Sequence, residues 1–184
     1  MVLLTLDRAL STATAALWRD AECFWTLAWE NTLSQPEWVR RLTAQSPIPL
    51  NTIDACCVGT GPGSFSGIRA AIAFAQGLTL PGKKKLLGAS GVAALSERIG
   101  HPVVGDARRG KVWIFDGEFH LEPQATFSPK EPVFTPDATR LSRLFPNSEF
   151  KQIHPDPTDL GRYLLAHPEA AAADPEPVYL QPAV

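Results

Sequence analysis

A glycine-rich turn between an apolar segment and a run of small residues constrains this chain more than any other feature. Residues 58–69 read VGTGPGSFSGIR and contain four glycines. The apolar residues 53–58 predict a buried strand, and apolar side chains recur at helical spacing over residues 65–79. Glycine tolerates positive φ angles and close backbone approach, and a helix N-terminus offers unpaired N–H groups. The stretch therefore predicts a tight strand-to-helix joint whose helix start can meet an anion or a partner's carboxylate.

The order of residues in this turn argues against three well-known glycine-loop chemistries. A dinucleotide-binding turn needs its third glycine where Ser64 or Ser66 stands, and a P-loop needs a lysine where Ile68 stands. A nucleophile elbow needs glycines two residues on either side of its serine, and neither serine has them. We expect the glycines to serve close packing, with Phe65 buried. Ser64, Ser66 and Arg69 are better candidates for contact with a partner, because polar groups at a helix start reach outward without disturbing the core.

Composition narrows the class of protein. The chain has 184 residues, of which 45% are hydrophobic and 20% charged, as is typical of a globular protein. Seventeen basic and nineteen acidic side chains give a net charge of -2, so we expect no direct binding of nucleic acid by this chain alone. Three cysteines without a Cys-x-x-Cys pair indicate free, buried thiols in a reducing compartment, and no apolar run approaches the roughly 18 residues of a membrane span. These observations predict a cytoplasmic protein, and the four scattered histidines predict no metal site.

Hydrophobic periodicity predicts the order of helices and strands in the first hundred residues. Three strands come first, followed by a helix that begins with a capping box at Ser34 and Glu37, and then by two strand–helix pairs. The expected elements span residues 2–6, 12–18, 23–30, 35–45, 53–58, 65–79, 85–87 and 90–99. The order β-β-β-α-β-α-β-α is that of the ribonuclease-H-like core of the actin and sugar-kinase ATPases, an α/β fold.

The second half of the chain predicts a separate, smaller lobe. Residues 103–108 and 111–116 flank Arg109 and Gly110 as a hairpin that starts a second sheet. Eleven of the 17 prolines follow residue 120, so short elements and long loops are expected there, with an alanine-rich helix at residues 164–173. We therefore predict an N-terminal ribonuclease-H-like lobe, residues 1–100, and a smaller C-terminal lobe, residues 101–184.

Together these segments resemble the bacterial TsaB family, formerly called YeaZ. Residues 61–69 are similar to the family motif Gly-Pro-Gly-Ser-Phe-Thr-Gly-Leu-Arg, and residues 106–113 to Asp-Ala-Arg-Arg-x-x-Val-Tyr. Residues 87–95 and 177–180 are similar to two further family segments, so the resemblance spans nearly the whole chain. It implies an actin-like ATPase (ASKHA) fold in two lobes, with a reduced C-terminal lobe.

The resemblance also implies a function. TsaB proteins are non-catalytic partners of TsaD, the subunit that forms N6-threonylcarbamoyladenosine, t(6)A, next to the tRNA anticodon, and the ATPase TsaE completes the assembly. By this resemblance the chain has no catalytic residue and no cofactor, it contacts TsaD through the helix from Gln35 and the helix after the glycine turn, and related chains form homodimers through an overlapping surface. The partner-binding or motif residues are then Gly61, Pro62, Gly63, Ser64, Phe65, Ser66, Gly67 and Arg69.

Two segments depart from the family pattern. The first strand is followed by Asp7-Arg8-Ala9 where the family has Asp-Thr-Ser, so the hydroxyls that would face a phosphate in an ATPase relative are absent. Asp7 is then a vestigial phosphate or metal position, and we expect Arg8 to be exposed on a hairpin turn, with contact to an anion as the alternative. A tryptophan-rich stretch from Trp29 to Trp38 replaces the family's His-Ser-Glu at the start of the first helix.

A rival function is an active ASKHA-type ATPase or small-molecule kinase. It would use Asp7 as a metal ligand and the glycine turn to approach phosphate, with Asp54 and Asp106 as further acidic candidates. Ordinary structural roles are favoured for these two carboxylates. A metallopeptidase ranks last, because the chain lacks a ligand set for a metal.

Overall fold

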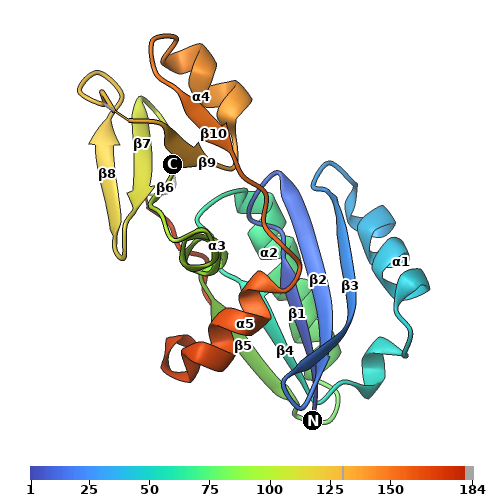
Figure 1. Cartoon of the computed structure of the whole chain (residues 1–184). Helices are drawn as coiled ribbons and strands as arrows, with labels where there is room; N and C mark the ends of the chain where they lie inside the picture. Colours follow the sequence, from blue (N-terminus) through green and yellow to red (C-terminus); the bar gives the residue numbers. More distant parts are fainter. Residues whose placement is uncertain (130, 181–184) are drawn as a thin grey trace.

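The protein contains two five-stranded sheets with helices packed around and between them (Figure 1). The computed structural model describes residues 1–129 and 131–180, so residues 181–184 of the predicted C-terminal lobe lie outside the described part. The first sheet and its helices comprise β1 (Val2–Asp7), β2 (Thr12–Arg19), β3 (Glu22–Glu30), α1 (Gln35–Gln45), β4 (Ala55–Gly59), α2 (Phe65–Thr79), β5 (Lys85–Ala89) and α3 (Gly91–Ile99). The remaining elements are β6 (Val103–Arg108), β7 (Lys111–Phe115), β8 (Phe119–Pro123), β9 (Val133–Thr135), α4 (Ala138–Leu144), β10 (Phe150–Gln152) and α5 (Asp159–Ala166).

The first sheet has the strand order β3-β2-β1-β4-β5. β1, β2 and β3 are antiparallel neighbours, whereas β4 runs parallel to β1 and β5 runs parallel to β4. The central strands β1 and β4 are buried on both faces and are accordingly apolar along nearly their whole length. The predicted order of three antiparallel strands followed by two parallel crossovers is confirmed.

Helices α1 and α2 cover one face of this sheet. Trp38 and Leu42 of α1 are fully buried, and Ile68 and Ala71 of α2 join the same core. The capping box predicted from the sequence is present, because the Ser34 N–H donates to the Glu37 carboxylate at 2.9 Å. Both helices begin and end at the residues that the pattern predicted.

Helix α5 covers the opposite face, where Leu160 and Leu164 pack against Cys57 and Ala89. The predicted helix at residues 164–173 is therefore misplaced. Pro168 lies just past the end of α5 and begins a short 3-10 helix, Pro168–Ala170. Beyond it, Ala172 forms an isolated bridge with Gly88 through two backbone hydrogen bonds of 2.9 Å. Pairing with the edge of β5 outweighs the helix propensity of alanine there.

The cysteines are only partly as expected. All three are free, and Cys56 and Cys57 are buried, but Cys23 is only partly buried. Burial raises the pKa of the Cys56 thiol to about 12, so this thiol is unreactive at neutral pH.

The second sheet has the strand order β10-β9-β6-β7-β8. The predicted hairpin joins β6 to β7, and Arg109 and Gly110 occupy its turn with φ angles of 49° and 72°. Positive φ at both central residues is the geometry that matches the twist of paired strands. Helix α4 packs on this sheet through Leu141, beside Val104 and Val112.

The chain returns from the second sheet to the first. Helix α5 packs on α3 and β1, and its end is joined to α3 by a hydrogen bond of 2.6 Å between the His167 ring and the Glu97 carboxylate. An ion pair of 2.6 Å joins Arg98 of α3 to Asp159 of α5. The division into lobes at residue 100 stays a prediction. Among the helices of the described residues, none combines the length and apolar character needed to cross a membrane.

Two glycines should respond in opposite ways to substitution by alanine. Gly161 of α5 lies against Trp18 of β2, whereas Gly77 of α2 has open space around it. A Cβ atom at Gly161 would overlap the indole ring of Trp18, whose Nε1 donates to Thr5 at 3.2 Å and so resists displacement. Gly161→Ala should therefore destabilise the protein by about 1–3 kcal/mol. Gly77→Ala in α2, where a Cβ would meet nothing within 4 Å, should stabilise it by about 0.5–1 kcal/mol. Urea unfolding of both variants measures the effects, and equal changes would contradict the packing of α5 described above.

Candidate functional site

The glycine turn folds as a tight joint between β4 and α2. Gly61 and Gly63 have φ angles of 97° and 156°, and the peptide bond between Gly61 and Pro62 is cis. Ser64 is the N-cap of α2, and its hydroxyl accepts a hydrogen bond of 3.2 Å from the Gly67 N–H. Part of the donor capacity of the helix start is thus satisfied within the turn.

The turn packs directly against the hairpin that follows β1. The Ser64 N–H donates to the Ala9 carbonyl at 2.6 Å, and a Cβ atom at Gly63 would overlap the same carbonyl. A Cβ at Gly67 would overlap the carbonyl of Arg8. These two glycines therefore permit backbone-to-backbone contact, in agreement with the packing role expected for them.

Asp7 ends β1 beside this joint and is enclosed by two other glycines. A Cβ atom at Gly59 or at Gly91 would overlap its carboxylate, and its Oδ1 accepts a hydrogen bond of 2.7 Å from the Ala9 N–H. Burial raises the pKa of Asp7 to about 6, and the nearby charge of Asp159 acts in the same direction. A carboxyl group in this position favours the neutral form more than an exposed aspartate does.

The other acidic candidates lie elsewhere and have structural partners. Asp54 accepts a hydrogen bond of 2.6 Å from the Val2 N–H, and the side chain of Asp106 forms ion pairs with Arg108 and Arg140. Within residues 1–129 and 131–180, no three side chains of His, Cys, Asp or Glu gather in a way that could hold a metal ion.

Arg8 is not exposed, which corrects the expectation for this residue. Only 5% of its surface is accessible, its Nε donates to the Asn31 side chain at 2.9 Å, and its guanidinium carbon lies 4.6 Å from the ring centre of Trp38. The backbone hairpin is where the sequence placed it, but the side chain turns inward toward α1. The aromatic surface of Trp38 attracts it there.

Phe65 is not buried, which corrects a second expectation. It is 49% exposed, because Ile68 and Ile72 occupy the core-facing stripe of α2 and Phe65 lies at the edge of that stripe. Its ring contacts Tyr179 at a centroid distance of 5.4 Å, and the guanidinium carbon of Arg69 lies 5.0 Å from its centre. Tyr179 belongs to the closing segment that resembles the family motif, but the sequence did not indicate that it reaches the turn.

The glycine turn forms one wall of a cleft of about 890 Å³. Residues 62–66 line it together with residues 9–11 of the first hairpin, residues 106–109 of the β6–β7 hairpin and residues 178–180. Five of the eight motif residues thus come together at the cleft. Gly61 and Gly67 are buried, and Arg69 lies on the exposed side of α2.

That exposed side of α2 is a continuous face of mostly small and uncharged residues. It runs along the whole helix, and Leu80 just past its end is 82% exposed. We call it the α2 face, and it consists of Phe65, Ser66, Arg69, Ala73, Gln76, Gly77 and Leu80. A face with so little charge is poorly matched to water and suits contact with another protein.

The chain is similar in sequence to proteins described by their part in tRNA modification. The family model described as "TsaD: tRNA N6-adenosine threonylcarbamoyltransferase" matches residues 33–132, more than half of the chain. A curated protein of Escherichia coli (strain K12), "tRNA threonylcarbamoyladenosine biosynthesis protein TsaB", is 29% identical over 150 residues. The matched region is 71% of this chain and 64% of that protein.

Solved structures support the fold. A Pseudomonas aeruginosa protein described as uncharacterised, with similarity to peptidase YEAZ, has a TM-score of 0.71 at 23% identity, covering 98% of this chain and 99% of the other. The structure described as YeaZ from Pseudomonas aeruginosa has a TM-score of 0.67 at 24% identity, covering 97% and 99%. The predicted α/β fold of the actin-like, ribonuclease-H-like type is thereby confirmed.

The raised pKa of Asp7 predicts how an Asp7→Asn variant responds to pH. The folded protein binds a proton at Asp7 more tightly than the unfolded chain does, so this group favours folding below about pH 4 and that contribution is lost as the pH rises through about 6. Between pH 4 and pH 7.5 the stability of Asp7→Asn should therefore rise relative to the natural protein by about 2 kcal/mol. Urea unfolding of both proteins across this range measures the change. A stability difference that does not vary with pH would contradict it.

Proposed function

Because this chain belongs to the TsaB/YeaZ family and matches the TsaD-type model, we propose that it acts in the biosynthesis of t(6)A in tRNA as a non-catalytic subunit. Its partner in this proposal is a TsaD-type threonylcarbamoyltransferase, joined by a TsaE-type ATPase. The chain supplies a binding surface that holds and activates the transferase and carries no reacting group itself.

The closed joint between the glycine turn and the first hairpin is the observation that carries the non-catalytic part of the proposal. The rival ATPase would need the glycine turn to approach a phosphate. Here the Ala9 carbonyl accepts the Ser64 N–H at 2.6 Å, and Gly63 packs on the same carbonyl. One donor at the helix start is therefore used within the fold and is not offered to a phosphate.

The side chains beside this joint support the same conclusion. Asp7 is buried between two glycines and uses one oxygen to accept the Ala9 N–H. Arg8 points toward α1 and leaves no hydroxyl or free charge in its place. A metal-bound phosphate needs accessible ligands, and burial withdraws the Asp7 carboxylate from that role.

The α2 face is the surface that we assign to the transferase. Its small residues, Ser66, Ala73 and Gly77, let another helix approach closely, and Leu80 offers an exposed apolar contact at one end. Helix α1 flanks α2 and presents Arg40 and Arg41 to solvent. A homodimer formed through the α2 face would compete with binding of the transferase.

The proposal predicts a complex that depends on the α2 face. When the chain is co-expressed with the TsaD-type protein of its own organism, the two should elute together in size-exclusion chromatography. Ala73→Glu should abolish the complex, because it places a charge in an apolar contact, and the stability of the chain should change by no more than about 0.5 kcal/mol.

The matched control is Ser142→Glu, another small exposed helical residue, on α4. This variant should bind as the natural protein does. Light scattering on the chain alone will show whether it forms a homodimer, and a dimer should also be disrupted by Ala73→Glu. No complex with the natural protein, with or without the TsaE-type ATPase and nucleotide, would refute the proposed function.

Arg69 provides a finer test of the same surface. Its guanidinium lies on Phe65 at the exposed start of α2, and the side chain makes no structural ion pair among those of the described residues. Arg69→Ala should weaken binding to the transferase, with a change in the free energy of unfolding below about 1 kcal/mol. Arg143→Ala, on the exposed side of α4, is the control. Unchanged binding together with a large loss of stability would show that Arg69 has a structural role.

A further inference from the structure

Arg8 is a buried guanidinium in a setting that lacks a carboxylate. Only 5% of its surface is accessible, and no carboxylate ion pair is found for it within the described ranges. Burial lowers its pKa, which is the sign of a cation removed from water. Arginine is rarely buried without a partner, so its position calls for a specific role.

We propose that Arg8 is a positioning residue that fixes α1 against α2, and so sets the shape of the two-helix surface that binds the transferase. The inference rests on the function proposed above for the α2 face. It adds that Arg8, which touches neither partner nor substrate, determines how well that surface fits.

Neutral groups take the place of a counter-ion around Arg8. Its Nε donates to the Asn31 Oδ1 at 2.9 Å, its Nη2 donates to the Leu33 carbonyl at 3.4 Å, and its guanidinium carbon lies 4.6 Å from the centre of the Trp38 ring. A planar guanidinium can stack on an indole and still donate from its edge, which an ammonium group cannot do. These three contacts tie the hairpin after β1 to the segment that leads into α1.

Asn31 also joins the segment before α1 to the hairpin after β1. Its Nδ2 donates to the carbonyls of Arg8 at 2.6 Å and of Leu10 at 2.9 Å, and its backbone N–H donates to the Ser11 carbonyl at 2.8 Å. The first hairpin and the entry to α1 are therefore joined through both backbone and side chain.

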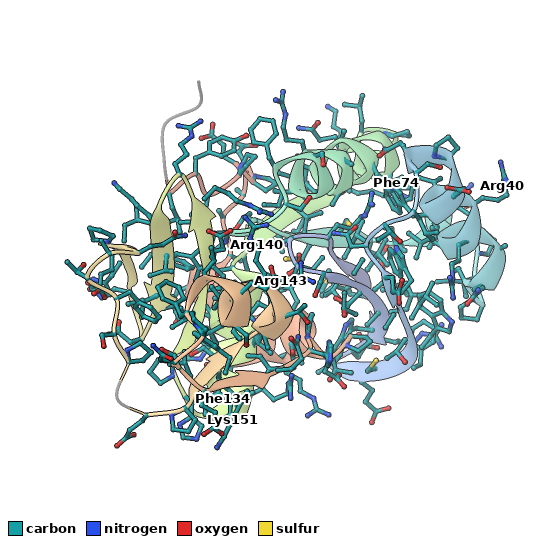
Figure 2. The ribbon with its side chains drawn as sticks, turned by 90° about the horizontal axis from the view of Figure 1, so that it is seen from above. Arg40, Phe74, Phe134, Arg140, Arg143 and Lys151 are labelled. Atoms are coloured by element: carbon teal, nitrogen blue, oxygen red, sulfur yellow. The ribbon has the colours of Figure 1, made fainter. Side chains whose placement is uncertain are left out.

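Trp38 connects these contacts to α2. Its ring meets Phe74 of α2 edge-on, with centroids 4.9 Å apart, and lies parallel to Trp29 of β3 at 6.4 Å. Figure 2 shows Phe74 on the side of α2 that lies toward α1, while Arg40 points away from the body of the protein. Arg8, Trp38 and Phe74 thus form one column from the first hairpin through α1 to α2.

Arg8 and Trp38 meet in this column although 30 residues of sequence separate them. The contact joins the hairpin after β1 directly to α1. The two side chains therefore act as a pair in holding the two-helix surface.

The test compares Arg8→Met with Arg19→Met. Methionine keeps an unbranched apolar stem but removes the charge and the donors. Arg19 is a matched control, because its guanidinium also lies on an aromatic ring, that of Phe24 at 5.0 Å, but at the β2–β3 turn and with its side chain exposed. Amide hydrogen exchange of the isolated chain measures the mobility of α1, and isothermal titration calorimetry with the TsaD-type protein measures affinity.

We expect Arg8→Met to speed amide exchange in residues 34–45 at least tenfold and to lower the affinity for the transferase at least tenfold. Arg19→Met should change neither the exchange rate nor the affinity. Arg8→Lys keeps the charge but lacks the planar guanidinium, so it should have the same effects as Arg8→Met. It replaces Arg8→Met in both measurements if that variant does not fold. Unchanged exchange in α1, unchanged affinity, or equal effects of Arg19→Met would each overturn the inference. If the natural protein fails to bind the transferase, the proposed function fails, whereas exchange in α1 still tests the positioning by Arg8.

Discussion

Direct backbone contact between the glycine turn and the hairpin after β1 is the constraint on which the rest of this structure depends. The Ala9 carbonyl accepts the Ser64 N–H, and the absence of a Cβ at Gly63 and Gly67 lets the two segments meet. This contact fixes where α2 begins, and hence which of its side chains face the core and which form the α2 face. A side chain at either glycine would push the helix away from the sheet.

Asp7 is part of the same contact. Asp7 is enclosed by Gly59 and Gly91, and the hydrogen bond that it accepts from the Ala9 N–H shapes the hairpin on which the turn rests. Its buried carboxyl group costs stability at neutral pH, since the charged form is poorly solvated. In return, the hydrogen bond from Ala9 fixes the hairpin on which the glycine turn rests.

Local signals in the sequence predicted the elements that local chemistry decides. α1 was predicted to the residue because a capping box, a proline in its first turn and its apolar spacing agree, and α2 because the glycine turn marks its start. Contacts distant in sequence decided the rest. The inward turn of Arg8 depends on Trp38, the ring contact of Phe65 depends on Tyr179, and the path of the chain after α5 depends on the bridge between Ala172 and Gly88.

The α2 face consequently depends on both ends of the chain. Near the N-terminus, Arg8 and Asn31 hold the hairpin against which α2 begins. Toward the C-terminus, the Val178 N–H donates to the Thr60 carbonyl at 2.8 Å and Tyr179 packs on Phe65. Segments from the two halves of the chain thus meet at the start of α2. The α2 face forms only when all of them are in place, which agrees with the non-catalytic subunit role proposed above.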